Sequence, residues 1–153
     1  MTYCVAMRLN AGLVFLSDSR TNAGVDQIAS FKKMRTFSNP GDRVIITLSS
    51  GNLSITQNAI NLLEQRGRHT DQPNLRNAEA MFDVATLLGD CLREVRKHNE
   101  AYFAESNVDM GVNFIIGGQL RGEAPRLFLV YAEGNCIEAT AETSYFQIGE
   151  TKY

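Results

Sequence analysis

The sequence has few residues of the kinds that build disulfide frameworks and metal sites. Its three cysteines, Cys4, Cys91 and Cys136, are far apart and show no CxxC spacing. Its two histidines, His69 and His98, belong to no HxxxH or HExxH motif. Scattered cysteines in odd number argue against a disulfide framework, and neither spacing fits a zinc site. We therefore expect buried free thiols, no bound metal and no cofactor.

The chain also lacks long apolar runs and an excess of positive charge. No apolar run approaches the ~18 residues of a membrane span, and the N-terminus has no basic region followed by a long apolar segment. The formal net charge of -2 offers no electrostatic attraction for nucleic acid or anionic membranes, which favours a protein or small-molecule partner. We expect a cytoplasmic protein. Its 153 residues, 44% of them hydrophobic, predict a single domain over residues 1–153.

Short apolar segments bounded by turn residues predict strands in both halves of the chain. The first two lie on either side of Asn10-Ala11-Gly12, and their almost continuous apolar character predicts a sheet covered on both faces. The next two flank Asn39-Pro40-Gly41-Asp42, a second hairpin turn. The predicted strands are residues 3–9, 13–17, 32–37, 43–48, 112–116, 127–131, 136–139 and 145–148.

Two helices are predicted between the two groups of strands. The first has apolar residues at helical spacing from Ile55 to Leu63, with Ser54 and Gln57 as a capping box and Gly67 at its end. The second has an apolar face from Met81 to Val95, and its charged run 93–97 is expected to face solvent. The element order indicates an α+β fold of two sheets with helices packed outside them. No helix follows the last strand, so we expect a domain truncated at its C-terminal end.

Thr2 is the residue most suggestive of chemistry. If Met1 is removed, Thr2 carries a hydroxyl and a free α-amine, whose pKa near ~8 leaves a useful fraction neutral to act as base for the hydroxyl. Such a nucleophile needs a nearby positive charge, for which Lys33 is the candidate, and an oriented carboxylate, for which Asp18 is the candidate. Thr2 starts one predicted strand, Asp18 ends its antiparallel partner and Lys33 begins the next, so the three could meet at one end of a sheet.

An amide donor for a developing oxyanion is also predicted. Ser49-Ser50-Gly51 lies between a strand and a helix, where backbone N–H groups are available. We expect the N–H of Ser50 to be the donor and Gly51 to allow close approach. Taken alone, each candidate has a structural explanation: Asp18 as a turn carboxylate, Lys33 as a solvated cation, the Ser-Gly segment as a helix cap. Cys4, on an apolar strand, is expected to be core rather than a nucleophile.

Together these residues resemble a known family. Thr2, Ser17-Asp18-Ser19-Arg20, Phe31-Lys32-Lys33-Met34 and Ser49-Ser50-Gly51 are similar to the β-subunits of the proteasome and their bacterial relatives. The opening residues and the Asp-Ser-Arg-Thr-Asn-Ala-Gly segment look closest to the bacterial proteasome-related Anbu group. The resemblance extends over essentially the whole chain.

The resemblance implies a four-layer αββα N-terminal nucleophile hydrolase that assembles into homo-oligomers and cleaves peptide bonds. It implies Thr2 as nucleophile, Asp18, Lys33 and Arg20 around it, and Ser50 with Gly51 at the oxyanion site. It also implies that Thr21, Phe31 and Leu48 line a substrate pocket with a weak preference for apolar side chains. Ser50 stands where the family commonly has Gly, and its side chain narrows the approach of a substrate to the amide donor. Glu150 stands where the family often has Ser. No propeptide precedes Thr2, so we expect activation by removal of Met1 alone.

Two other functions fit the same residues. One is a non-catalytic assembly subunit of a proteasome-like shell. The other is an amidohydrolase that acts on small amides or γ-glutamyl compounds with the same nucleophile. An arginine positioned for a carboxylate in an open pocket favours this amidase, whereas self-association around a protected interior favours the peptidase.

Overall fold

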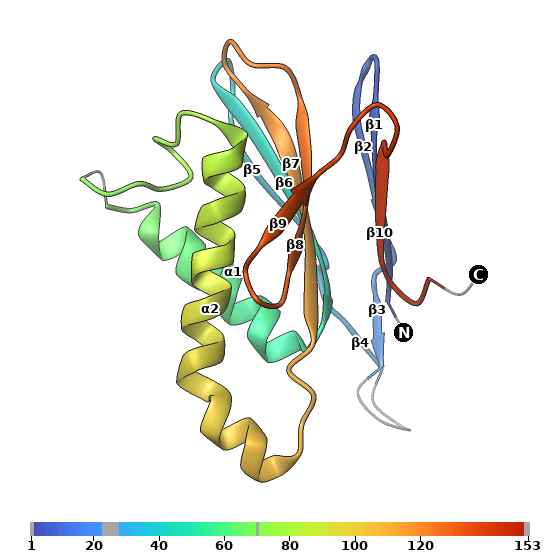
Figure 1. Cartoon of the computed structure of the whole chain (residues 1–153), viewed down its shortest axis with the longest axis vertical. Helices are drawn as coiled ribbons and strands as arrows, with labels where there is room; N and C mark the ends of the chain where they lie inside the picture. The colour runs from blue at the N-terminus through green and yellow to red at the C-terminus, as the bar shows by residue number, and fades with distance from the viewer. Residues whose placement is uncertain (1, 23–27, 70, 152–153) are drawn as a thin grey trace.

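The computed structural model describes residues 2–22, 28–69 and 71–151, and only the backbone of residues 20–22 and 28–30. Within these residues, three layers follow one another: a pair of helices, a five-stranded sheet and a three-stranded sheet (Figure 1). The α+β class is confirmed. The fourth layer and the C-terminal truncation stay predictions.

The five-stranded sheet forms the middle layer. Every neighbouring pair of its strands is antiparallel. In spatial order its strands are β5 (Met34–Asn39), β6 (Arg43–Gly51), β7 (Val112–Leu120), β8 (Arg126–Tyr131) and β9 (Cys136–Glu138). Because side chains alternate between the faces of a strand, the sheet supplies two cores. Ile45, Phe114 and Phe128 pack toward the helices. Leu48, Ile115 and Leu127 pack between the sheets.

The three-stranded sheet has one buried and one exposed face. Its spatial order is β10 (Tyr145–Gly149), β1 (Tyr3–Leu9) and β2 (Gly12–Ser17), all antiparallel. Its inner face is apolar and packs on the middle sheet. The outer face is exposed at Tyr3, Met7, Leu9, Val14, Leu16 and Tyr145. No described helix lies on that side (Figure 1), so the expected cover of this face, like the fourth layer, stays a prediction.

A small two-stranded sheet follows β2 and was not predicted. Its strands β3 (Arg20–Asn22) and β4 (Ile28–Ser30) pair antiparallel, with Thr21 opposite Ala29. Strands of three residues are too short for an alternating pattern to be visible in the sequence.

The first helix, α1 (Leu53–Arg66), begins differently from the prediction. Its N-cap is Asn52, whose side-chain oxygen accepts hydrogen bonds from the N–H groups of Ser54 and Ile55. Ser54 is inside the helix, so the predicted Ser54 and Gln57 capping box is wrong. Asn is as good an N-cap as Ser, and the residue that is positioned before the first turn takes the role. Gly67 is at the C-terminal end as predicted.

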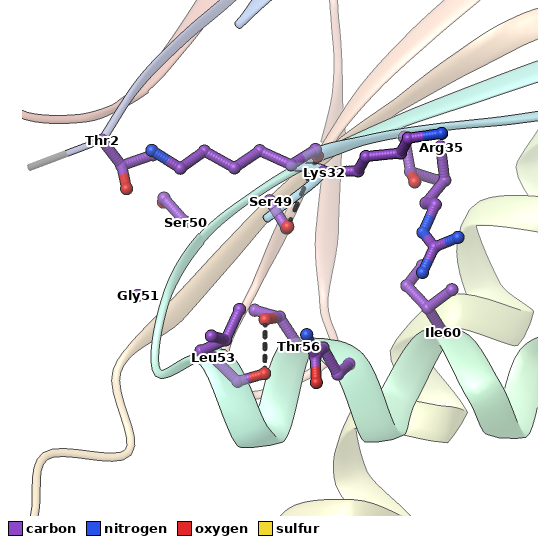
Figure 2. A pocket seen from close by; sticks show the side chains of 12 residues that line it. Thr2, Lys32, Arg35, Ser49, Ser50, Gly51, Leu53, Thr56 and Ile60 are labelled. Atoms are coloured by element: carbon purple, nitrogen blue, oxygen red, sulfur yellow. Dashed lines mark hydrogen bonds between the residues drawn. The ribbon is translucent and has the colours of Figure 1, made fainter. Parts of the chain in front are cut away.

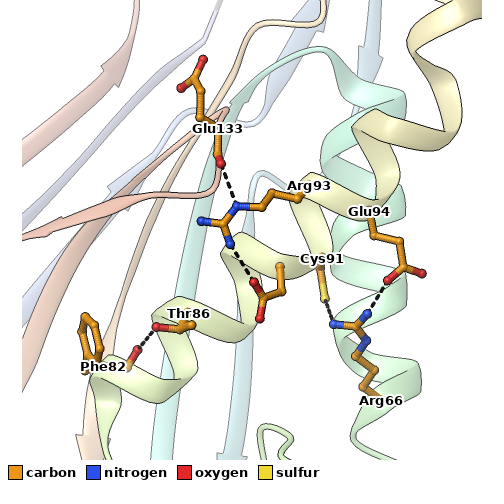
Figure 3. A network of polar contacts seen from close by, with 8 residues as sticks. Arg66, Phe82, Thr86, Cys91, Arg93, Glu94 and Glu133 are labelled. Carbon is orange, nitrogen blue, oxygen red and sulfur yellow. Dashed lines mark hydrogen bonds and ion pairs between the residues drawn. The ribbon is translucent and has the colours of Figure 1, made fainter.

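The second helix, α2 (Met81–Ser106), carries charged residues that are not all solvated. Arg93 donates to the carbonyl oxygen of Glu133 at 3.0 Å, as Figure 3 shows, and Arg96 donates to that of Ala132 at 2.7 Å. The prediction that residues 93–97 form a solvated face is wrong for Arg96, which is 27% exposed, and holds for Arg93, which is 52% exposed. Both side chains nonetheless donate hydrogen bonds to backbone carbonyls. They hold α2 against the turn between β8 and β9. A helical pattern cannot reveal such a partner, since the turn lies about 40 residues further along the chain.

Contacts between the two helices complete that layer. Arg66 of α1 donates to Glu94 and to the thiol sulfur of Cys91, both on α2 (Figure 3).

The strand predicted at 112–116 is longer than expected, because Gly117 and Gly118 continue β7 rather than end it. A Cβ on Gly118 would lie 2.1 Å from the carbonyl oxygen of Val44, so the glycine permits a close strand approach. Among the described helices, none has the length and apolarity to cross a membrane.

Candidate active site

Thr2 lies just before β1, at one end of the three-stranded sheet. Tyr3 opens β1 and pairs with Gly149 of β10. The N–H of Glu150 donates to the carbonyl oxygen of Thr2 at 2.7 Å, and the N–H of Asp18 donates to that of Tyr3 at 3.1 Å. The backbone of Thr2 and of the residue after it is therefore held by the segments that directly follow β10 and β2.

The carboxylate of Asp18 connects this backbone to Lys33. One oxygen, Oδ1, accepts from the N–H of Tyr3 at 2.8 Å, and the other, Oδ2, accepts from the ammonium nitrogen of Lys33 at 2.7 Å. The Lys33 side chain is buried, only 6% exposed. Its backbone carbonyl accepts from the N–H of Ser49 at 3.0 Å, which ties the segment before β5 to the end of β6. Asp18 and Lys33 thus meet beside Thr2. Lys33 precedes β5 of the five-stranded sheet, so the three residues lie where two sheets meet rather than at the end of one.

A small cavity of about 40 Å³ joins Thr2 and Lys33 to the end of β6. Figure 2 shows Thr2, Ser50 and Gly51 toward one end of it and Arg35 toward the other. Its described lining residues are Thr2, Lys32, Lys33, Arg35, Thr47, Ser49, Ser50, Gly51, Leu53, Thr56, Gln57 and Ile60. The cavity lies where the middle sheet meets the first turns of α1.

Ser50 and Gly51 reach this cavity from the last residues of β6. Ser50 is buried and pairs with Asn113 of β7. Gly51 has a φ of 99°, a conformation that favours glycine, and the chain turns there into the cap of α1. Their roles at an oxyanion site stay predictions.

The other predicted site residues are not among the described residues that line the cavity. Leu48 is fully buried in the core between the two sheets, and Phe31 is 36% exposed; neither lines the cavity in the described part of the chain. The side chains of Arg20 and Thr21 lie outside the described residues. Substrate contacts for Thr21, Phe31 and Leu48, and the charged role of Arg20, stay predictions.

Cys4 is a core thiol beside the ion pair. It is fully buried, and burial is the main reason that its pKa rises to about 11; Asp18 adds to the rise and Lys33 opposes it. Its sulfur lies 3.8 Å from the carbonyl oxygen of Ser49. A thiol with such a pKa stays protonated at neutral pH, which agrees with the prediction that Cys4 is core rather than a nucleophile.

Lys32, Arg35, Thr47 and Thr56 line the cavity and were missed as site residues. Arg35 pairs with Thr47 across β5 and β6. A signal for Arg35 was present, because residues two apart on an extended segment share a face and Arg35 follows Lys33 at that spacing. Thr56 had no comparable signal, since its position depends on how α1 packs against the sheet.

Solved structures of known proteins are highly similar to this chain. Anbu (ancestral beta-subunit) from Yersinia bercovieri is 50% identical, with a TM-score of 0.91 over 99% of this chain and 62% of that one. A structure of the helical assembly of the Anbu complex from Pseudomonas aeruginosa is 46% identical, with a TM-score of 0.92 over 99% and 62%. Anbu from Hyphomicrobium sp. strain MC1 is 46% identical, with a TM-score of 0.88 over the same shares. No family model matches the chain, and no curated protein matches it.

These similarities and the two-sheet fold define a proteasome-related protein whose architecture is compatible with an N-terminal nucleophile hydrolase. Within that class, the chain belongs to the Anbu (ancestral beta-subunit) group. It spans about three fifths of the length of the Anbu structures that it matches.

Proposed function

We propose that the chain is the core of a threonine-type peptidase subunit that cleaves peptide bonds through Thr2 after removal of Met1. The observation that carries the proposal is the position of the Asp18 carboxylate, which holds both the backbone next to Thr2 and the buried ammonium of Lys33. An ammonium beside the site disfavours a second positive charge on the Thr2 amine and favours developing negative charge on its hydroxyl oxygen. We place the reaction in the cytoplasm, with no metal and no cofactor.

The proposed reaction has two steps. In the first, the hydroxyl oxygen of Thr2 forms a bond to the carbonyl carbon of the scissile amide while the α-amine takes the hydroxyl proton. The C–N bond then breaks, the leaving amine receives that proton, and an ester to Thr2 remains. In the second, water attacks the ester, the α-amine takes a proton from the water, and the proton returns to the Thr2 oxygen as it leaves.

Stabilisation of the tetrahedral intermediate is assigned to the N–H of Ser50. Removal of one such donor typically costs roughly 2.7–4 kcal/mol of transition-state stabilisation. The buried Ser50 side chain stands beside that amide and limits the space for substrate. Gly51, next along the chain, carries no side chain that would narrow the approach further.

We also propose that the protein assembles with copies of itself. Support comes from the Anbu complex of P. aeruginosa, whose structure is described as a helical assembly. Enclosure by such an assembly would restrict the site to unfolded chains and short peptides.

A second candidate function has its own observation. The side chains of Lys32 and Arg35 line the cavity beside Thr2, and an arginine at that place favours an amidohydrolase for small carboxylate-bearing amides. The nucleophile and both chemical steps are the same. A non-catalytic assembly subunit is the third outcome of the test below.

The test compares the wild type with Thr2→Ala and Thr2→Ser, using a mixed peptide library and mass spectrometry of products and of the intact protein. We expect loss of Met1, cleavage by the wild type and Thr2→Ser, and none by Thr2→Ala, with assembly size unchanged. Undiminished cleavage by Thr2→Ala would refute the proposed nucleophile. Retained Met1 without cleavage would leave the assembly subunit as the function.

A further inference from the structure

The cavity beside Thr2 has an unbalanced positive charge. Three of its lining residues are cationic, Lys32, Lys33 and Arg35, and none of the described lining residues is acidic. Lys33 has its counterion in Asp18. The side chains of Lys32 and Arg35 form no hydrogen bond or ion pair with any residue that the structure describes. Two cations therefore face this cavity without a protein partner in the described chain, and both residues are exposed to solvent.

The remaining lining fits an anion as well. Thr47, which is almost fully buried, lies opposite Arg35 in the register of β5 and β6 and contributes a hydroxyl, and Gln57 of α1 contributes an amide. The first turn of α1 holds no acidic residue, so the positive end of its dipole is not neutralised by a carboxylate there. The dipole alone would not define a site. Here the dipole adds its positive end to the two side-chain cations that line the same cavity.

Geometry relates these cations to the reacting atoms. Thr2 and Ser50 are toward one end of the cavity and Arg35 toward the other, as Figure 2 shows. A substrate whose scissile carbonyl lies at Thr2 would extend the neighbouring side chain along the cavity toward Arg35. The volume of about 40 Å³ is larger than the roughly 10–15 Å³ that one water molecule needs on the same measure. A carboxylate on a thin alkyl stem fits this space.

We propose that this cavity binds a carboxylate on the acyl part of the substrate, so that the site cleaves amide bonds that follow an acidic residue. This inference rests on the proposed function and deepens it. It replaces the weak apolar preference expected from Thr21, Phe31 and Leu48, since Leu48 is in the core and cations occupy the cavity. The same carboxylate is present in an acidic peptide and in a small γ-glutamyl amide, and the experiment separates these two sources.

The experiment measures hydrolysis of blocked tetrapeptide amides that differ only in the residue before the scissile bond: Glu, Gln or Leu. Glu and Gln have nearly the same size, so their ratio isolates the charge. A hydrogen-bonded charge pair is worth a factor of roughly 10 to 100, and we expect Glu to exceed Gln in kcat/KM by that factor. The preference should shrink at high salt, because cations at a partly open site are screened. A γ-glutamyl anilide forms the second arm: faster turnover of the anilide than of the Glu peptide assigns the carboxylate to small amides.

Variants identify the residues responsible. Arg35→Gln and Lys32→Gln should each bring the ratio of kcat/KM for the Glu peptide to that for the Gln peptide close to one. Lys97→Gln on the exposed side of α2 makes the same change of charge and should keep the wild-type ratio. Thr2-dependent cleavage with no preference for Glu would overturn the inference and leave the proposed function intact. If the wild type cleaves none of the substrates, the proposed function fails, and peptide binding by Thr2→Ala decides the inference. Tighter binding of the Glu peptide than the Gln peptide, lost in Arg35→Gln, supports it, and equal binding overturns it.

Discussion

Gly149 lies directly against the backbone of Thr2: a Cβ at Gly149 would be 2.0 Å from the Thr2 carbonyl oxygen. The φ of Gly149 is 92°, so both the conformation and the contact require glycine. The next residue, Glu150, donates its N–H to that same oxygen. The end of β10 therefore determines where Thr2 sits, from a position almost 150 residues along the chain.

Gly149→Ala is expected to displace Thr2 and to lower hydrolysis at least tenfold. A Cβ at 2.0 Å from a carbonyl oxygen cannot be accommodated without backbone movement, and small displacements of a reacting group cost up to about 10²-fold in rate. Gly41→Ala is the control, because Gly41 also has a positive φ, 81°, but no neighbour within 4 Å of its Cβ position. Both variants introduce the strain of a non-glycine residue at positive φ, and only Gly149→Ala should lose activity. Equal activity of the two would show that β10 does not position Thr2.

Asp18→Asn is expected to lower both stability and hydrolysis. The amide oxygen can still accept from Tyr3, but the buried ammonium of Lys33 loses the negative charge 2.7 Å away. Because Asp18 is 35% exposed, we expect a loss of about 1–3 kcal/mol rather than the full cost of a buried unpaired charge. Urea unfolding and peptide hydrolysis measure the two effects.

The matched control is Asp90→Asn, which breaks the half-exposed pair of Asp90 with Arg93. A surface pair of this kind is worth at most about 1 kcal/mol. A cost for Asp18→Asn no larger than for Asp90→Asn would mean that the Asp18 carboxylate contributes no special stabilisation.

The buried thiols predict a loss of stability at high pH. The pKa values of Cys4 and Cys91 rise from an ordinary 9.0 to about 11, mainly because burial disfavours the thiolate. Between these values the unfolded chain releases the protons first, so stability is complete below about pH 9 and falls as the pH rises toward about 11. Two pKa units correspond to at most about 2.7 kcal/mol per thiol. The double variant Cys4→Ala and Cys91→Ala should show a flatter profile in urea unfolding at pH 8 to 10.5, and an unchanged slope would contradict the assignment.

Both helices and most strands could be predicted from the sequence. In these segments apolar residues repeat over many positions, because a buried face repeats at the spacing of its element. The cap of α1 was misplaced by two residues, since Asn52 and Ser54 are both good caps and only packing selects between them. Whether a layer covers the outer face of the three-stranded sheet cannot be derived from its strands, because an apolar strand has the same sequence with or without such a layer.

The candidate site was predictable in part. Asp18 and Lys33 meet because each lies at a strand end, and strand ends can be located from the sequence. The cavity could not be derived in this way: Arg35 and Thr47 pair across the β5–β6 hairpin, but Thr56 joins them only through the packing of α1 against the sheet, which no local pattern encodes. Leu48 was predicted to line the pocket but lies in the core between the two sheets. The face of β6 on which its side chain lies depends on the strand register.

Gly89→Ala tests whether close packing outweighs helix propensity. Alanine is favoured over glycine inside a helix by about 1 kcal/mol, so propensity alone predicts a gain in stability. However, a Cβ at Gly89 would lie 2.1 Å from the carbonyl oxygen of Gly134, in the turn that Arg93 also holds. Overpacking of this kind costs typically 1–3 kcal/mol, so we expect a net loss in the free energy of unfolding. Gly67→Ala at the end of α1, where φ is -64° and suits any residue, should be close to neutral. A gain in stability for Gly89→Ala, measured by urea unfolding, would mean that α2 and the turn between β8 and β9 separate easily.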